Sequence, residues 1–168
     1  MLGKTIKIKY NKISYQHQTY RTLFEYKTIL KIDFNNIKII TIVRNPYNRA
    51  VSDLFYFNLI NNKSSKEEVY IKLKKFINSE FHIYDNHNLP QYEYIIDTNG
   101  KINNNIKIFR CENLTNDMIN DGFHKFNNNV NTNKSGKIDY YKFLNKDSIN
   151  LINNYYDKDF KLFNYKKL

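Results

Sequence analysis

The sequence contains almost no cysteine and no tryptophan, and it is also poor in glycine and proline. Its 168 residues include one cysteine, Cys111, together with four glycines and two prolines. A single cysteine excludes an internal disulfide, and no group of cysteines and histidines has the spacing of a zinc site. The sequence therefore predicts neither a disulfide-stapled fold nor a bound metal.

Long hydrophobic runs are missing as well. No apolar stretch approaches the ~18 residues that a membrane-spanning helix needs. The N-terminal segment MLGKTIKIKY is basic but lacks the apolar core of a signal peptide. We therefore expect no transmembrane segment in this sequence and favour a soluble location, with the compartment and the oligomeric state left open.

Acidic residues are outnumbered by basic ones, 16 against 27, which gives a net charge of +11. Such a balance favours polyanionic partners, namely nucleic acids, phosphorylated cofactors or acidic glycans. Asn, Lys, Ile, Tyr and Phe are all overused, so part of this charge is equally well explained as lysine filling the surface. The hydrophobic content of 41% suffices for one core, and we expect a single domain over residues 1–168.

Strands and helices are expected to alternate along the chain. Apolar patterns predict strands at 6–10, 37–43, 92–96 and 106–110. Amphipathic periodicity and capping residues predict helices at 19–30, 46–57, 65–77, 115–126 and 146–156. A reversal signal at 98–100 predicts that the last two strands form a hairpin, and the continuous run at 37–43 predicts a strand covered on both faces. The order implies an α/β fold with parallel central strands.

The stretch KIITIVRNPYNRAVSDLFYF combines a strand, a helix start and polar side chains. Arg44 follows the strand, Asn45 can cap a helix, and Pro46 suits its first turn. Ligands of such sheets bind beyond the carboxyl ends of strands, and a helix N-terminus attracts anions. Ser52 lies two turns into the helix, on the side of Asn45. We expect a phosphate site here; the alternative is a surface Arg44 paired with a carboxylate and a Ser52 that merely fills a helix position.

The segment VRNPYNRAVSDLFYF resembles the 3′-phosphate-binding motif of sulfotransferases that use 3′-phosphoadenosine-5′-phosphosulfate (PAPS). That motif is a strand ending in Arg, then Asn/Asp-Pro-Tyr, a second Arg, and Ser before an aromatic-rich helix. The branch it is most similar to includes the carbohydrate sulfotransferases. Further segments that resemble this branch, in the same order, are His17–Leu23, Asn88–Tyr94, Ile108–Leu114 and Tyr155–Tyr165.

The resemblance implies a P-loop-NTPase-like sulfotransferase fold, with a central parallel sheet flanked by helices. It implies that Arg44 and Ser52 hold the 3′-phosphate of PAPS, while Arg49 ties the helix to a nearby carboxylate. A basic loop with Lys134 and Ser135 either closes over the nucleotide, as in relatives, or is an ordinary solvated loop.

Two features of the family are not matched. Relatives cradle the 5′-phosphosulfate in a loop Pro-Lys-x-Gly-Thr/Ser, which this sequence does not contain. The fold is therefore expected to be N-terminally truncated relative to the family. Cys111 stands where several relatives have a tyrosine that contacts adenine.

The expected reaction is transfer of a sulfuryl group from PAPS to a hydroxyl acceptor, in particular on a carbohydrate. His17 is the first candidate for the base that accepts the hydroxyl proton, and His87 is the second. Each is otherwise an ordinary loop histidine. The alternatives are a catalytically inactive remnant that keeps the nucleotide site or a partner site, and a basic nucleic-acid-binding protein. Nucleic acid is disfavoured because no motif supports it.

Overall fold

A computed structural model describes residues 5–8, 11–14, 17–126 and 139–168 of the chain. The strands are β1 (Thr5–Ile8), β2 (Asn11–Ser14), β3 (Ile39–Val43) and β4 (Ile106–Arg110). The α-helices are α1 (Tyr20–Glu25), α2 (Lys27–Leu30), α3 (Pro46–Tyr56), α4 (Lys66–Ile77), α5 (Leu114–Asn120), α6 (Lys146–Tyr155) and α7 (Asp157–Leu162). Short 3-10 helices are η1 (Phe81–Tyr84), η2 (Gln91–Tyr94), η3 (Cys111–Asn113) and η4 (Tyr140–Phe143).

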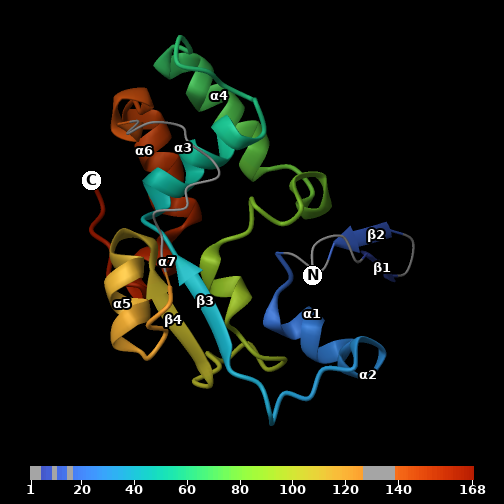
Figure 1. The fold of residues 1–168 in the computed structure, drawn as a ribbon. Helices are drawn as coiled ribbons and strands as arrows, with labels where there is room; N and C mark the ends of the chain where they lie inside the picture. The colour runs from blue at the N-terminus through green and yellow to red at the C-terminus, as the bar shows by residue number, and fades with distance from the viewer. Residues whose placement is uncertain (1–4, 9–10, 15–16, 127–138) are drawn as a thin grey trace.

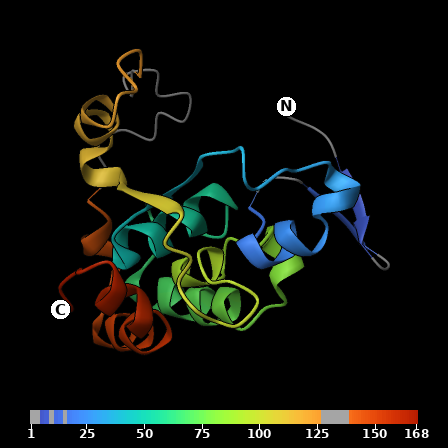
Figure 2. The same cartoon turned by 90° about the horizontal axis from the view of Figure 1, so that it is seen from below.

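A parallel pair of strands, β3 and β4, lies at the centre of the fold (Figure 1). Their register runs from Ile39 opposite Ile106 to Val43 opposite Arg110. The antiparallel hairpin of β1 and β2 stands apart from this pair, on the far side of α1 (Figures 1 and 2). The fold is thus mixed α/β, with a two-stranded parallel sheet and surrounding helices.

The largest core lies beyond the carboxyl end of β3, where α3 packs with α4, α6 and η4 (Figure 1). The inner stripe of α3, predicted from its periodicity, is buried at Ala50, Val51 and Leu54. Removing a side chain such as Leu54 from water contributes roughly 1.5–3 kcal/mol. This core holds α3, and with it the end of β3, in a fixed position.

The hairpin predicted between 92–96 and 106–110 is wrong. Residues 91–94 form η2, and the only antiparallel contact found there in the described residues is an isolated bridge between Ile96 and Ile102. The segment 106–110 is a strand, but it pairs in parallel with β3. The turn at 97–101 is real, since the Asp97 carboxylate accepts the N–H groups of Asn99 and Lys101. A strong turn signal therefore predicted a reversal but not its strand partners.

Other boundaries also differ from the sequence expectation. The helix predicted at 19–30 is split into α1 and α2 at Tyr26, and the helix predicted at 115–126 ends at Asn120. β3 is not covered on both faces, because Ile42 is 49% exposed. Within the described ranges no helix is long and apolar enough to cross a bilayer.

Asn45 caps α3 as the sequence predicts: its side-chain oxygen accepts the Tyr47 N–H at 3.0 Å. We expect Asn45→Ala to lower the free energy of unfolding by about 1 kcal/mol, because that N–H loses its acceptor. Urea unfolding followed by circular dichroism measures the change. Asn62→Ala, at an exposed position of a loop, is the matched control and should leave stability unchanged. Equal losses in the two variants would show that the cap contributes nothing.

Candidate functional site

Arg44 directly follows β3, and its backbone is clamped by a side chain from another part of the chain. Gln91 accepts the Arg44 N–H through Oε1 at 2.7 Å and donates from Nε2 to the Arg44 carbonyl at 2.9 Å. The next amide, that of Asn45, donates to Oε1 of Glu112 at 2.7 Å. Three consecutive polar groups at the end of β3 are thus satisfied by side chains, which fixes the direction in which the strand enters α3.

Gln91 is held in turn by Asp159, a fully buried carboxylate of α7. Asp159 accepts the N–H groups of Gln91 and Tyr92 at 2.7 and 2.9 Å, and a weaker bond at 3.3 Å from Gln91 Nε2. Burial raises the pKa of Asp159, although these hydrogen bonds favour its charged form. Through this chain of contacts α7 positions η2, and η2 positions the end of β3.

Glu112 is anchored by the C-terminal tail. Its Oε2 accepts the Tyr165 hydroxyl at 2.8 Å, while its Oε1 holds the Asn45 amide. The ring of Tyr165 also lies under the Arg110 guanidinium, 5.1 Å from its centre. The segments 88–94, 108–114 and 155–165 therefore all meet at the junction of β3 and α3.

The Arg44 guanidinium differs from those of the other three arginines. Arg21 pairs with Glu93, Arg49 with Asp53, and Arg110 donates to the Phe163 carbonyl.

Arg44 instead lies over the Tyr140 ring, 5.1 Å from its centre. Among the described residues its guanidinium has no carboxylate or carbonyl acceptor. The hydroxyl of Ser52, which lies within α3, also has no hydrogen-bond partner among the described residues. The expected alternative, an Arg44 paired with a carboxylate, is therefore not what the structure has. The Arg44 guanidinium and the Ser52 hydroxyl are thus left available to an anion, whereas the Asn45 and Tyr47 amides at the N-terminus of α3 already have side-chain acceptors.

Arg49 lies inside the fold, with its side chain 14% exposed. It donates to the carbonyls of Leu89 and His87 at 2.7 and 2.8 Å, and its Nε lies 3.8 Å from the Asp53 carboxylate. Burial opposes its charge most strongly, but Asp53, Tyr156, Tyr94 and Asp159 together outweigh burial, so the pKa of Arg49 is raised. These contacts agree with the structural role expected for this residue: it fastens the loop before Gln91 to α3.

The two candidate bases, His17 and His87, contact each other. Their ring centres lie 4.2 Å apart at an interplanar angle of 67°. Nδ1 of His17 lies 2.9 Å from the Asp85 carboxylate, and Nδ1 of His87 lies 3.2 Å from that of Asp53. A carboxylate only accepts, so Nδ1–H donates in both rings and the neutral tautomer leaves Nε2 as a proton acceptor.

Helix α3 links the end of β3 at Arg44 to the two histidines. Asp53, which holds His87, directly follows Ser52. With a rise of 1.5 Å per residue, Asp53 lies roughly 12 Å along the helix axis from Asn45. The structure thus places His17 and His87 in contact with each other beside α3. The described contacts do not join Arg44 to Ser52, which lies roughly 10 Å along the helix axis from Asn45. Lys134 and Ser135 lie outside the described residues.

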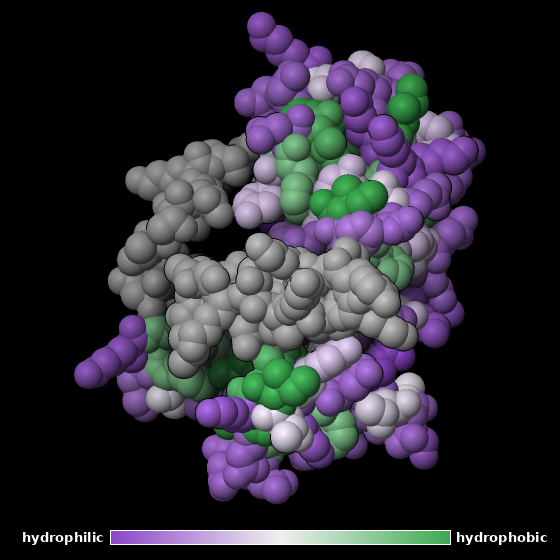
Figure 3. Space-filling view, turned by 90° about the vertical axis from the view of Figure 1, so that its right-hand side faces the viewer, coloured by the Kyte–Doolittle hydropathy of each residue, from purple (hydrophilic) through white to green (hydrophobic). Residues whose placement is uncertain are grey.

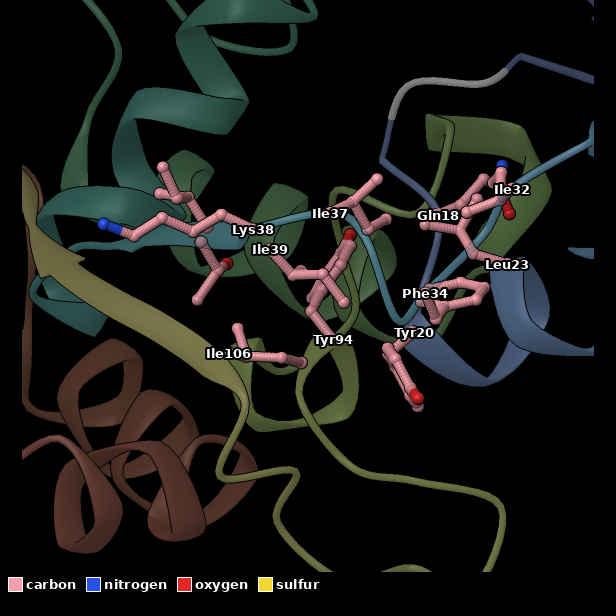
Figure 4. Close-up of a pocket in the computed structure, with 12 residues that line it drawn as sticks. Gln18, Tyr20, Leu23, Ile32, Phe34, Ile37, Lys38, Ile39, Tyr94 and Ile106 are labelled. Atoms are coloured by element: carbon pink, nitrogen blue, oxygen red, sulfur yellow. The ribbon is translucent and has the colours of Figure 1, made fainter.

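An apolar cavity of about 280 Å³ lies away from this site, between β3 and α1 (Figure 4). Its lining includes Tyr20, Phe34, Ile39 and Tyr94. Its one charged side chain, Lys38, extends away from the other lining groups in Figure 4 and pairs with Asp121 at 2.8 Å. The cavity therefore offers no cation to an anionic ligand, and we do not regard it as the nucleotide site.

Several residues of the site were not predicted. Gln91 and Glu112 lie in segments that resemble the family, but the sequence assigned them no role. Tyr140 carried no signal at all. Cys111 is exposed. In the part of the chain that the structure describes, no group of three or more acidic, histidine or cysteine side chains could hold a metal ion.

Searches of family models, curated proteins and solved structures found no match to this chain.

Proposed function

We propose that this protein is a sulfotransferase-family protein with a sulfotransferase-like fold, which binds the 3′-phosphate of PAPS with Arg44 and Ser52. The observation that carries the proposal is the Arg44 guanidinium, which stands at a strand end before a capped helix N-terminus and has no carboxylate or carbonyl acceptor among the described residues. Ser52, two turns into that helix, adds a hydroxyl. An uncompensated arginine held in place by a fixed backbone is what recognition of a phosphate requires.

The convergence of the resembling segments supports the same proposal. Gln91, Glu112 and Asp159 come from separate segments, and all contribute to holding the β3–α3 junction. Three of the four further segments that resemble the family thus meet at the same junction.

The proposed reaction is transfer of the sulfuryl group from PAPS to a hydroxyl, in particular on a carbohydrate. In this reaction the acceptor oxygen bonds to sulfur as the bond from sulfur to the phosphate oxygen breaks, and a base takes the hydroxyl proton. His17 suits the role of the base, because the bond from its Nδ1 to Asp85 leaves Nε2 to accept a proton. No described residue is assigned to the 5′-phosphosulfate, so nucleotide binding without turnover is the second candidate function.

Binding of adenosine 3′,5′-bisphosphate tests the nucleotide site directly. At ~100 times its dissociation constant a ligand stabilises the fold by ~2.7 kcal/mol. For a chain of this size that corresponds to a rise of roughly 5–10 °C in Tm. We expect this rise in the wild type and its loss in Arg44→Ala.

The matched control is Arg21→Ala, which removes the same charge from a pair with Glu93 and should keep the ligand-induced rise in Tm. No rise in the wild type, or an equal rise in Arg44→Ala, would refute the nucleotide site. If the wild type instead bound single-stranded DNA with a steep salt dependence that Arg44→Ala did not change, a nucleic-acid-binding function would replace it.

A further inference from the structure

Tyr56, the last residue of α3, presents an aromatic face to solvent. It is 59% exposed, which makes it the most exposed aromatic side chain in the described part of the chain. Its ring stacks on His87 with centres 5.4 Å apart and planes 11° from parallel. Phe57 meets the Tyr56 ring edge-on at 5.0 Å and 86°. One face of Tyr56 is therefore supported by a partly buried histidine, and the ring is fixed although it is exposed.

The position of Tyr56 links the two parts of the proposed site. Ser52 and Tyr56 are four residues apart on α3 and so lie on the same face, one turn from each other. Asp53 holds His87, which carries Tyr56 on one side and contacts His17 on another. The exposed ring of Tyr56 therefore lies next to the histidine pair, at the end of the helix that begins at the proposed anion site.

We propose that Tyr56, together with His17 and His87, forms the subsite for a sugar ring of the acceptor. The axial C–H groups of a pyranose carry partial positive charge and pack on the negative face of an aromatic ring. His87, which stacks on Tyr56, and His17, which contacts His87, would offer Nε2 atoms to the hydroxyls of such a ring. The assignment of this sugar as a sulfate acceptor rests on the proposed function, whereas the binding of the sugar does not.

The charges around Tyr56 favour a neutral sugar over a nucleic-acid base, which would also stack on tyrosine. Both histidines are bonded to carboxylates, Asp85 and Asp53, and the Asp85 side chain is 38% exposed. A carboxylate accepts hydrogen bonds from sugar hydroxyls but repels the phosphates that accompany a base. Figure 3 shows the molecule from the side of the N-terminal hairpin, where apolar groups lie among hydrophilic ones.

Binding of neutral disaccharides to the full chain, without nucleotide, tests the subsite. We would add lactose or N,N′-diacetylchitobiose and follow the Cε1–H resonances of the four histidines by NMR. Two of the four should shift in the wild type, and Tyr56→Phe, which keeps the aromatic face, should shift them similarly. Tyr56→Leu keeps apolar bulk but loses the face, so its apparent Kd should be weaker by roughly fivefold or more.

Ile71→Ala, a truncation at a 63% exposed position of α4, is the control and should bind like the wild type. Absence of any histidine shift in the wild type with either sugar, or equal Kd values for Tyr56→Leu and the wild type, would overturn the subsite. The result of this sugar-binding test can be distinguished from the result of the nucleotide-binding test. Sugar binding without binding of adenosine 3′,5′-bisphosphate would refute the transferase while the subsite stands, and the reverse would refute the subsite alone.

Discussion

Replacement of Arg49 by alanine is expected to lower the free energy of unfolding by about 3–5 kcal/mol, because it leaves a nearly buried carboxylate without its cation. The Asp53 side chain is only 12% exposed, and Arg49 is the cation beside it. The same change leaves the carbonyls of Leu89 and His87 without their guanidinium donors. Thermal unfolding should show a fall in Tm of roughly 10 °C for a chain of this length.

Two variants separate this effect from a simple loss of charge. Arg49→Lys keeps the charge but cannot reproduce both carbonyl contacts and the approach to Asp53, so it should recover only part of the stability. Arg21→Ala removes an arginine whose side chain is 43% exposed and should cost no more than about 1 kcal/mol. If Arg49→Ala were no more destabilising than Arg21→Ala, Arg49 would not be the fastening residue that its contacts indicate.

Asp159→Ala is expected to lower the free energy of unfolding by about 2–4 kcal/mol, because it leaves the amides of Gln91 and Tyr92 without an acceptor in a buried place. Chemical denaturation at neutral pH measures the loss. Lys166→Ala, at an exposed position of the C-terminal tail, is the control and should be close to neutral. Since Gln91 holds Arg44, the Asp159→Ala variant should also bind adenosine 3′,5′-bisphosphate more weakly. Unchanged stability would mean that water replaces the carboxylate at no cost.

Asp159→Asn should change how the free energy of unfolding depends on pH. Burial raises the pKa of Asp159 above its unfolded value of 3.8, so the folded chain holds this proton more tightly than the unfolded chain. This one group therefore makes stability decrease as pH rises through the range just above 3.8. Stability measured against pH should fall more steeply there in the wild type than in Asp159→Asn. Parallel curves would show that the pKa of Asp159 is not raised.

The local features of the fold were predictable, because their causes lie within a few residues. Asn45 and Pro46 mark the start of α3, and Ser65 caps α4 through the Glu68 N–H as expected. The pairing of β4 was not predictable in this way. A turn signal at 97–101 describes only the chain that it joins, whereas the partner of β4 is fixed by contacts with β3, far away in the sequence.

The candidate site divides in the same way. The positions of Arg44 after a strand and of Ser52 within a helix were predicted, because local geometry alone places them, and their role in binding phosphate stays a prediction. The contact between His17 and His87 was not, and neither were their carboxylates, which lie 68 and 34 positions away along the chain. Only packing of the loop at 85–91 against α3 brings these groups together.

The clamp of Gln91 on Arg44 also has a consequence for self-association. An exposed strand edge can template the addition of further strands from other molecules. Consecutive amides of an extended chain point in opposite directions. The Asn45 amide points toward Glu112, just after β4, so the Arg44 amide points to the other edge of β3, where Gln91 accepts it. A side-chain amide thus takes the place of the last backbone pair on that edge. Any foreign strand that docked on this edge of β3 would therefore have to stop before Arg44.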